Sequence, residues 1–138
     1  MFSWWRKLLY PQSKKFSYDL VPWRNPVYED KNYLIFRDGF PVTDGHVLYV
    51  PKFYDRKALS IVHDAAFCRG LFGIRYGHWD GFNIGLNFRE AAGQTIMWPH
   101  VHLIPRRNGD CSDPRGGVRN VIPGKGNYLH PTYGKPIC

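Results

Sequence analysis

Hydrophobic and polar residues alternate in four segments of the chain, and a period of two is typical of a half-buried β-strand. The first two segments, 32–38 and 46–51, are joined by the short stretch "DGFPVTDG". A Gly/Pro/Asp-rich loop of this length predicts an antiparallel hairpin. The other two segments, 80–87 and 94–106, are separated by a turn at "FREAAG". We therefore expect two pairs of strands.

Between the two pairs the period changes to that of an α-helix. Leu59, Val62 and Ala66 recur at helical spacing, and Asp55 stands where an N-cap is needed. Glycine at position 73 or 77 should end this helix, because glycine favours the helix C-terminus. The order β-β-α-β-β predicts the α+β class, with an antiparallel sheet, one long helix across a face and an irregular Gly/Pro-rich tail.

The length of 138 residues fits one domain. We expect residues 1–25 to form a basic and aromatic extension, residues 26–107 the catalytic domain, and residues 108–138 a basic tail packed on it. No segment has the ~18 consecutive apolar residues of a membrane span, and the N-terminal stretch lacks the pattern of a signal peptide. Three widely spaced cysteines without a C-x-x-C pair predict a cytoplasmic protein.

The formal net charge of +8 indicates anionic partners, among them nucleic acid, an anionic membrane surface and free phosphate compounds. The N-terminal stretch "SWWRK" interleaves aromatic and basic side chains, which suits stacking on unpaired bases. A nucleic-acid-binding module is therefore one alternative for the function.

The last predicted strand carries the candidate chemistry. Along this strand Trp98, His100 and His102 share one face, which we expect to be open to solvent. The opposite face, which we expect in the core, carries Thr95, Met97, Val101 and Leu103. Pro99 stands between Trp98 and His100, and because proline has no backbone N–H it argues for an edge strand or a β-bulge. A neutral imidazole can attack phosphorus without first losing a proton, so this face favours nucleophilic catalysis on a phosphate. Two alternatives remain open: a zinc site made by His46, His100 and His102, or two ordinary surface histidines.

The segment "GQTIMWPHVHLIPRR" resembles the signature of the histidine-triad (HIT) family, in which a Gln precedes three alternating histidines separated by apolar residues. Here Trp98 occupies the first triad position. The resemblance covers residues 26–107, since "VYEDKNYLIFRDGFPVTDGHVLYVPK" is similar to the opening hairpin of the family and "NIGLNFREAAGQT" to its penultimate strand and loop. The branch that the chain resembles is that of the dinucleoside polyphosphate hydrolases.

The resemblance implies roles for individual residues. His100 matches the nucleophile that forms a nucleotidyl-phosphohistidine, and His102 matches the histidine that contacts the phosphate. Nucleotide-binding roles are implied for Asp38, His46, Asn87, Gln94, Thr95 and Trp98. Of these, Asp38 would hold the ribose hydroxyls or be a plain turn residue, and His46 would orient the nucleophile or simply be buried. The indole of Trp98 would donate to a backbone carbonyl or stack on the base or ribose, and it cannot act as a base.

The implied function is hydrolysis of a phosphoanhydride at the α-phosphorus of a purine nucleotide, with a dinucleoside polyphosphate as the expected substrate. A nucleoside phosphoramidase, a nucleotidyltransferase and a catalytically weakened nucleotide-binding or nucleic-acid-binding module are the alternatives. Arginine binds phosphate in a bidentate manner, so Arg106, Arg107 and Arg115 are expected to bind the distal phosphates. We expect no required cofactor, with Mg²⁺ accompanying the substrate. The resemblance also implies a homodimer in which two sheets join.

Overall fold

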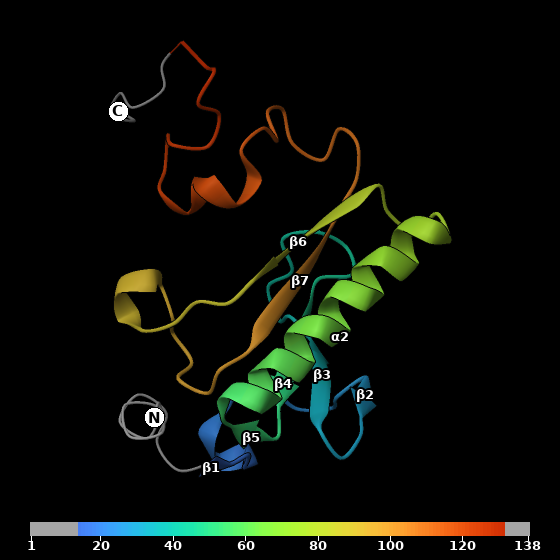
Figure 1. Cartoon of the computed structure of the whole chain (residues 1–138), viewed down its shortest axis with the longest axis vertical. Helices are drawn as coiled ribbons and strands as arrows, with labels where there is room; N and C mark the ends of the chain where they lie inside the picture. The colour runs from blue at the N-terminus through green and yellow to red at the C-terminus, as the bar shows by residue number, and fades with distance from the viewer. Residues whose placement is uncertain (1–13, 132–138) are drawn as a thin grey trace, which may run out of the picture.

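The structure is a computed structural model that describes residues 14–131, and its centre is a five-stranded antiparallel sheet (Figure 1). The strand order is β2-β3-β4-β7-β6, and each strand is antiparallel to its neighbours. The strands are β2 Tyr28–Glu29, β3 Tyr33–Arg37, β4 Val47–Pro51, β6 Gly81–Gly85 and β7 Val101–Arg106. This sheet and its single long helix confirm the predicted α+β class, and β3 and β4 form the expected hairpin.

The long helix α2 spans Arg56–Arg75 and begins where the sequence predicts. The carboxylate of Asp55 accepts a hydrogen bond of 2.8 Å from the backbone N–H of Ala58, which satisfies one of the free donors of the first turn. The helix continues through Gly73 and ends just before Gly77, whose φ of +74° is the left-handed conformation that glycine adopts easily.

One hydrophobic core fills the space between α2 and the sheet. Val62 and Ala66 of the helix pack on Val101 and Leu103 of β7, and all four side chains are almost fully buried. The burial of β7 alternates along the strand, as the sequence predicts for its core face. This packing fixes the helix on one face of the sheet and directs His102 to the other face.

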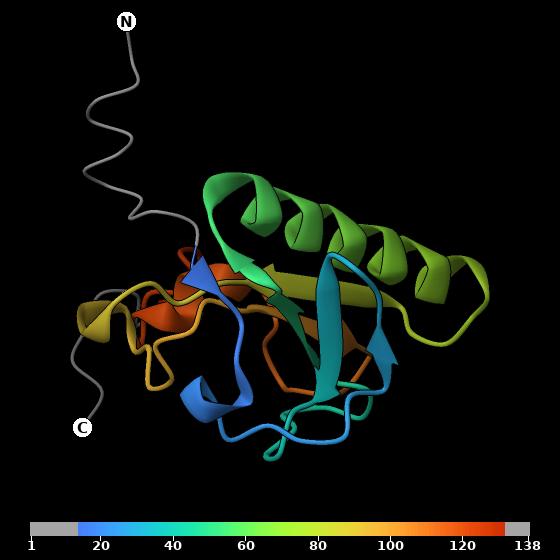
Figure 2. The same ribbon diagram turned by 90° about the horizontal axis from the view of Figure 1, so that it is seen from below.

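A second core covers the opposite face, where residues 14–24, which we call the N-terminal arm, run along the sheet (Figure 2). Strand β1 (Lys14–Lys15) pairs with β5 (Phe53–Tyr54), and the short 3-10 helix η1 (Tyr18–Leu20) follows. Val21 is buried in this core, with Phe16 and Trp23 packed against it. We expected the histidine face to be open to solvent, and this expectation is wrong around Trp98, because the N-terminal arm supplies a second apolar layer.

The last strand is shorter than predicted. It begins at Val101 rather than at residue 94, and the segment before it is irregular apart from the 3-10 helix η2 (Glu90–Ala92). Pro99 has no N–H to donate to a neighbouring strand, which explains why regular pairing starts after it. Trp98 and His100 therefore lie on an irregular approach to β7, and Met97, expected in the core, is exposed.

Beyond β7 the chain is irregular except for the 3-10 helix η3 (Gly117–Val121), which contacts β6. Within residues 14–131, no helix has the length and hydropathy to cross a membrane. The stretch "SWWRK" and residues 132–138 lie outside the described residues.

Candidate active site

A cavity of about 520 Å³ lies at the ends of β3 and β4, between the N-terminal arm and the loop that precedes β7. It brings together six residues that the sequence singled out: Asp38, Asn87, Gln94, Thr95, His100 and His102. Segments that are far apart in the sequence meet here, because β4 pairs with β7 in the middle of the sheet.

The imidazole of His100 is held in one tautomer by a backbone carbonyl. Its Nδ1 lies 2.8 Å from the carbonyl oxygen of Trp98. Because a carbonyl can only accept, Nδ1 carries the proton and Nε2 keeps its lone pair. The ring is buried, and the edge-on ring of Trp23 packs against it at 4.8 Å between centroids. This arrangement leaves one fixed, unprotonated nitrogen for attack.

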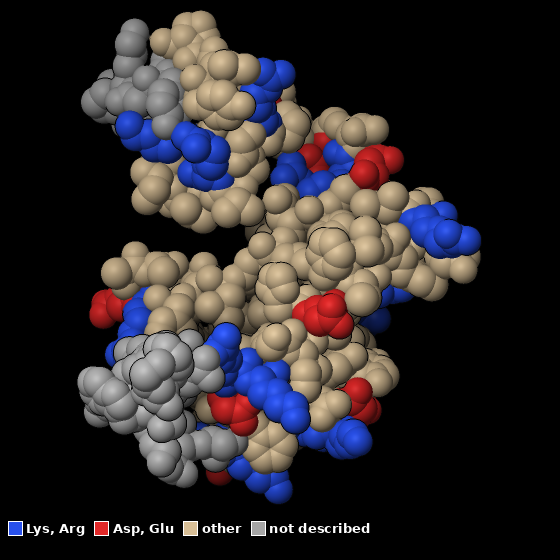
Figure 3. Space-filling model, viewed as in Figure 1, with Lys and Arg blue, Asp and Glu red and all other residues tan. Residues whose placement is uncertain are grey.

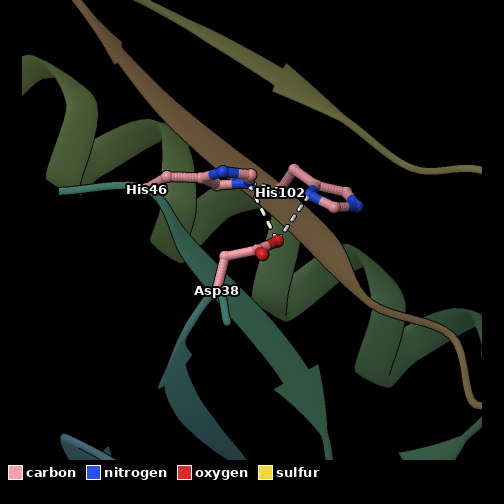
Figure 4. A group of neighbouring side chains, drawn as sticks. All are labelled: Asp38, His46 and His102. Atoms are coloured by element: carbon pink, nitrogen blue, oxygen red, sulfur yellow. Dashed lines mark hydrogen bonds and ion pairs between the residues drawn. The ribbon is translucent and has the colours of Figure 1, made fainter. Parts of the chain in front are cut away.

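His102 is held by a second chain of hydrogen bonds that runs through His46, and Figure 4 shows both imidazoles beside the carboxylate of Asp38. The backbone N–H of Val42 donates to Nδ1 of His46 at 3.2 Å, so the proton of a neutral His46 is on Nε2. That Nε2 donates to Nδ1 of His102 at 2.9 Å and lies 3.4 Å from the Oδ2 atom of Asp38. His102 therefore carries its own proton on Nε2. We expected His46 to orient the nucleophile, but its ring contacts His102 instead.

The local fold of the hairpin loop places these groups. Asp38 follows β3, and its Oδ1 atom accepts a hydrogen bond of 2.8 Å from the backbone N–H of Phe40. The backbone N–H of Asp38 donates to the carbonyl oxygen of His46 at 3.1 Å, which closes the loop. Asp38 is thus a turn residue and also a wall of the cavity.

All three histidines favour the neutral form. Burial lowers the pKa of His46 and of His100 below the usual value, against the opposing charge of Asp38. Burial, followed by the neighbouring rings of His100 and His46, lowers the pKa of His102 to about 4. At neutral pH His100 is therefore unprotonated at Nε2, and His102 donates without carrying a charge.

A metal site is the alternative to this hydrogen-bonded chain. The structure brings His46 and His102 together with Asp38, whereas the zinc site considered from the sequence combined them with His100. The ligand atoms of Asp38, His46 and His102 lie within 4.8 Å of one another. A metal at this place would need the lone pair of Nε2 on His46, and the N–H of Val42 already fixes a proton there. The hydrogen bonds therefore fit a role of His102 as a hydrogen-bond donor better than metal ligation.

The loop before β7 is shaped by Gln94. Its Oε1 atom accepts from the backbone N–H of Arg89 at 2.6 Å, and its Nε2 atom donates to the carbonyl oxygens of Ile96 and Met97. Gly93, with φ of +83°, turns the chain next to it. The amide of Gln94 is thus occupied with the backbone. Thr95 and Asn87 line the cavity, and Asn87 makes no hydrogen bond through its side chain within residues 14–131.

Trp98 lies in the core and does not line the cavity of His100, so of the two uses predicted for its indole the structure shows the hydrogen bond to a backbone carbonyl. The side chain is 4% exposed, and its Nε1 donates to the carbonyl oxygen of Pro51 at 2.9 Å. The rings of Phe16 and Tyr54 pack edge-on against the indole, both at 5.7 Å between centroids. A large apolar ring is most stable in such a layer, so the indole is unavailable to stack on a base or ribose.

The three arginines predicted to bind distal phosphates are placed differently. Arg106 makes a bidentate pair with Asp110, with both N–O distances at 2.8 Å, and donates to Asn83 at 2.9 Å. This pairing raises the pKa of Arg106 and lowers that of Asp110. Arg107 donates to the carbonyl oxygen of Asp44 at 3.0 Å, and Arg115 lies exposed on the tail, outside the cavity.

Sequence reasoning missed the contribution of the N-terminal arm. Trp23 and Arg24 of the arm line the cavity. Arg37 of β3 and Phe40 of the hairpin loop, which is 92% exposed, line it as well. The guanidinium of Arg24 donates to the carbonyl oxygens of Val21 and Trp23, which holds the arm in place. The only sequence signal was an aromatic residue next to a basic one in "PWRNP".

Comparison with known proteins agrees with this geometry. The family model "HIT domain" matches residues 23–109. An uncharacterized HIT-like protein of Methanocaldococcus jannaschii is 36% identical over 104 residues, which are 69% of this chain and 79% of that protein. The adenylylsulfatase HINT3 of Arabidopsis thaliana is 34% identical over 94 residues, 62% of this chain but only 47% of the plant protein.

Solved structures show the same fold. A zinc-bound histidine triad family protein from Mycobacterium smegmatis superposes with a TM-score of 0.57 and 33% identity, covering 62% of this chain and 67% of that one. A hypothetical histidine triad nucleotide-binding protein from Sulfolobus tokodaii gives a TM-score of 0.53 and 33% identity, covering 64% of each chain. With the family model matching more than half of the residues, this chain belongs to the HIT domain family.

Proposed function

We propose that this protein is a nucleotide hydrolase that works through a nucleotidyl-His100 intermediate. The observation that carries the proposal is the hydrogen bond between Nδ1 of His100 and the carbonyl oxygen of Trp98, which leaves Nε2 free to attack. In the first step the bond from Nε2 to the α-phosphorus forms as the bond to the leaving group breaks. In the second step water adds to phosphorus, the bond to Nε2 breaks, and a proton is released to solvent.

His102 supports this reaction as a hydrogen-bond donor. Its Nε2–H would hold a phosphoryl oxygen, and the unoccupied amide of Asn87 would hold another. His102 does not transfer this proton, because a neutral imidazole that lost it would become an imidazolate. The leaving group must therefore depart without a proton, as a polyphosphate does, or arrive already protonated.

Asp38 and the arm define the nucleoside end of the site. A carboxylate can accept from two vicinal hydroxyls, so Asp38 would hold the ribose. Trp23 offers an aromatic wall beside it. The name adenylylsulfatase, given to the plant relative, supports an adenylyl group as the part of the substrate that is retained.

The substrate that the sequence predicts is a dinucleoside polyphosphate, accompanied by Mg²⁺. A nucleoside phosphoramidate is the second candidate, and the engagement of Arg106 and Arg107 with their neighbours favours it, since a phosphoramidate needs no cations beyond the α-phosphorus. Transfer to an acceptor other than water would use the same residues. A cytoplasmic location stays a prediction.

We also propose a homodimer in which two sheets join. Strand β6 is at the edge of the sheet, and its Phe82 packs edge-on against Phe67 of α2. Leu71 and Ile74 continue the exposed apolar stripe of α2 at helical spacing from Phe67. An open strand edge beside an apolar stripe suits a two-fold partner.

Intact-protein mass spectrometry tests the catalytic proposal. The protein is mixed at alkaline pH, which preserves a phosphoramidate bond, with diadenosine tetraphosphate or with adenosine 5′-phosphoramidate. We expect a transient mass gain of one AMP that is absent from His100→Ala, and AMP as the product. An adduct that persists in His100→Ala would overturn the assignment of the nucleophile. Binding of nucleotide with neither adduct nor AMP would support the catalytically weakened binding module.

A further inference from the structure

A separate cavity, of about 710 Å³, lies between the N-terminal arm, β5 and the loop 88–98 that precedes β7, and we call it the arm cavity. Gln94 lines both the arm cavity and the cavity of His100, so its side chain is part of the wall between the two. His100 itself lines only its own cavity. The volume of the arm cavity is typical of a site for a small organic molecule.

The body of the arm cavity is apolar. Leu20, Phe88 and Met97 line it, and these three side chains are between 39% and 56% exposed. The buried indole of Trp98 lines it as well. Apolar side chains that surround one hollow and are still open to water gain free energy when a ligand covers them. The hollow therefore suits an apolar group.

Two cations, Lys14 and Arg89, complete this lining, and within residues 14–131 neither has a carboxylate at ion-pair distance. The guanidinium of Arg89 lies over the ring of Phe88, 5.5 Å from its centroid, so a positive charge adjoins the apolar lining. Lys14 lies opposite Tyr54, just before α2 begins, and Figure 3 shows Lys and Arg side chains over the first turns of this helix. Such a basic surface attracts anions toward the cavity.

Arg89 has a backbone conformation that favours glycine, with φ of +77° and ψ of +164°. The loop holds it there, because the N–H of Arg89 donates to Oε1 of Gln94 and its carbonyl oxygen accepts from the N–H groups of Ala92 and Gln94. Strained residues of this kind occur at ligand clamps. Glycine would meet the demands of the backbone at this position, so the strain is explained if the guanidinium has a use in the arm cavity.

We propose that the arm cavity binds an amphipathic monoanion, namely a carboxylate on an alkyl or aryl body. The apolar body lies against Leu20, Phe88 and Met97, and the carboxylate pairs with Lys14 and Arg89. The binding is noncovalent and does not depend on the proposed hydrolysis. The ligand contacts the wall between the two cavities without entering the cavity of His100, which stays open for a nucleotide.

The test is isothermal titration calorimetry of the full chain with decanoate and three comparison compounds. Decanol and decyltrimethylammonium keep the apolar body but lack the negative charge, whereas butanoate keeps the carboxylate and loses most of the apolar body. We expect decanoate to bind one-to-one and at least tenfold more tightly than each comparison compound, because only decanoate satisfies both parts of the lining.

Arg89→Gly should weaken decanoate binding about tenfold and fold at least as stably as the native protein, because glycine adopts this backbone conformation without strain. Lys14→Gln should weaken it to a similar degree. Lys15→Gln is the matched control, because Lys15 is the next residue, is also exposed and does not line the cavity. Arg37→Gln is a second control, since Arg37 is a cation that lines only the cavity of His100. Both controls should bind decanoate as the native protein does.

Selective binding of decanoate that is weakened in Arg89→Gly and Lys14→Gln and kept in both controls supports the site. No binding of decanoate, equal binding of decanoate and decanol, or an equal loss in Lys15→Gln would overturn it, the last by showing a response to surface charge alone. A loss in Arg37→Gln would overturn it by placing the anion in the cavity of His100. None of these measurements involves turnover, so their failure leaves the nucleotidyl-His100 proposal intact, and failure of that proposal leaves this inference intact.

Discussion

Trp98→Phe separates a structural role of Trp98 from a catalytic one. The substitution removes the hydrogen bond of 2.9 Å from Nε1 to the carbonyl of Pro51 and leaves that carbonyl without this donor in the core. Loss of a buried hydrogen-bond partner costs about 1–3 kcal/mol. The smaller ring also leaves a gap next to Phe16 and Tyr54, which adds roughly 1 kcal/mol, well below the cost of full truncation to alanine. We expect the free energy of unfolding to fall by about 2–4 kcal/mol in total.

The assay is urea denaturation followed by far-UV circular dichroism, together with the rate of AMP adduct formation on the folded protein. The rate should change less than about threefold, because the backbone carbonyl that binds His100 is still present in the variant. Trp79→Phe is the matched control, since Trp79 is also buried and its Nε1 donates to the carbonyl of Gly70 at 2.9 Å, beneath the end of α2. Both variants should be destabilised to a similar degree. A Trp98→Phe protein of unchanged stability that forms the adduct more than tenfold more slowly would refute the reasoning, since the indole would then act on the substrate.

Three other expectations test separate parts of the structure. Because the pKa of His100 lies below 6.5 and that of His102 is about 4, the neutral forms persist as the pH falls through 6.5. Single-turnover adduct formation from diadenosine tetraphosphate should therefore decline only at more acidic pH, and an acidic limb centred at 6.5 or above contradicts the assignment. Gly73→Ala should destabilise the protein by about 1–3 kcal/mol in urea denaturation, because the new Cβ would lie 1.8 Å from the indole of Trp79. Helix propensity alone favours alanine, so increased stability would show that this contact relaxes freely. Leu71→Asp should convert a dimer into a monomer in sedimentation equilibrium without loss of helix content, and an unchanged mass would remove α2 from the interface.

The sequence predicted those features that depend on local spacing. The helix followed from its period and the Asp55 cap, the hairpin from its loop, and the proximity of His100 and His102 from alternation along one segment. The bidentate pair of Arg106 with Asp110 was not predicted, because a spacing of four residues indicates an ion pair only on a helix, and the chain turns after β7 instead.

The N-terminal arm was not predictable in the same way. Its contacts join residues 16–23 to residues 36 and 98, far along the chain, and the arm shows no sustained period of its own. Likewise, the partner of His46 could not be chosen between His100 and His102 from sequence. The choice depends on the pairing of β4 with β7, where Leu48 lies opposite His102.

The tautomers of His100 and His102 are set by backbone atoms, which explains how the site can accommodate tryptophan at position 98. The carbonyl of Trp98 fixes the proton of His100, and the N–H of Val42, acting through His46, fixes the proton of His102. Neither hydrogen bond uses the side chain of residue 98. That side chain is free to serve another purpose, and in this chain it anchors the segment before β7 to Pro51 and to the arm. A histidine at this position would bring a second polar nitrogen into a layer where the rings of Phe16 and Tyr54 pack edge-on against the side chain, and burying that nitrogen without a hydrogen-bond partner would be costly. The polar network around His46 and His102 and the aromatic layer around Trp98 thus hold the two ends of the segment 98–102 independently, so a tryptophan at position 98 is compatible with the proposed nucleophilic role of His100.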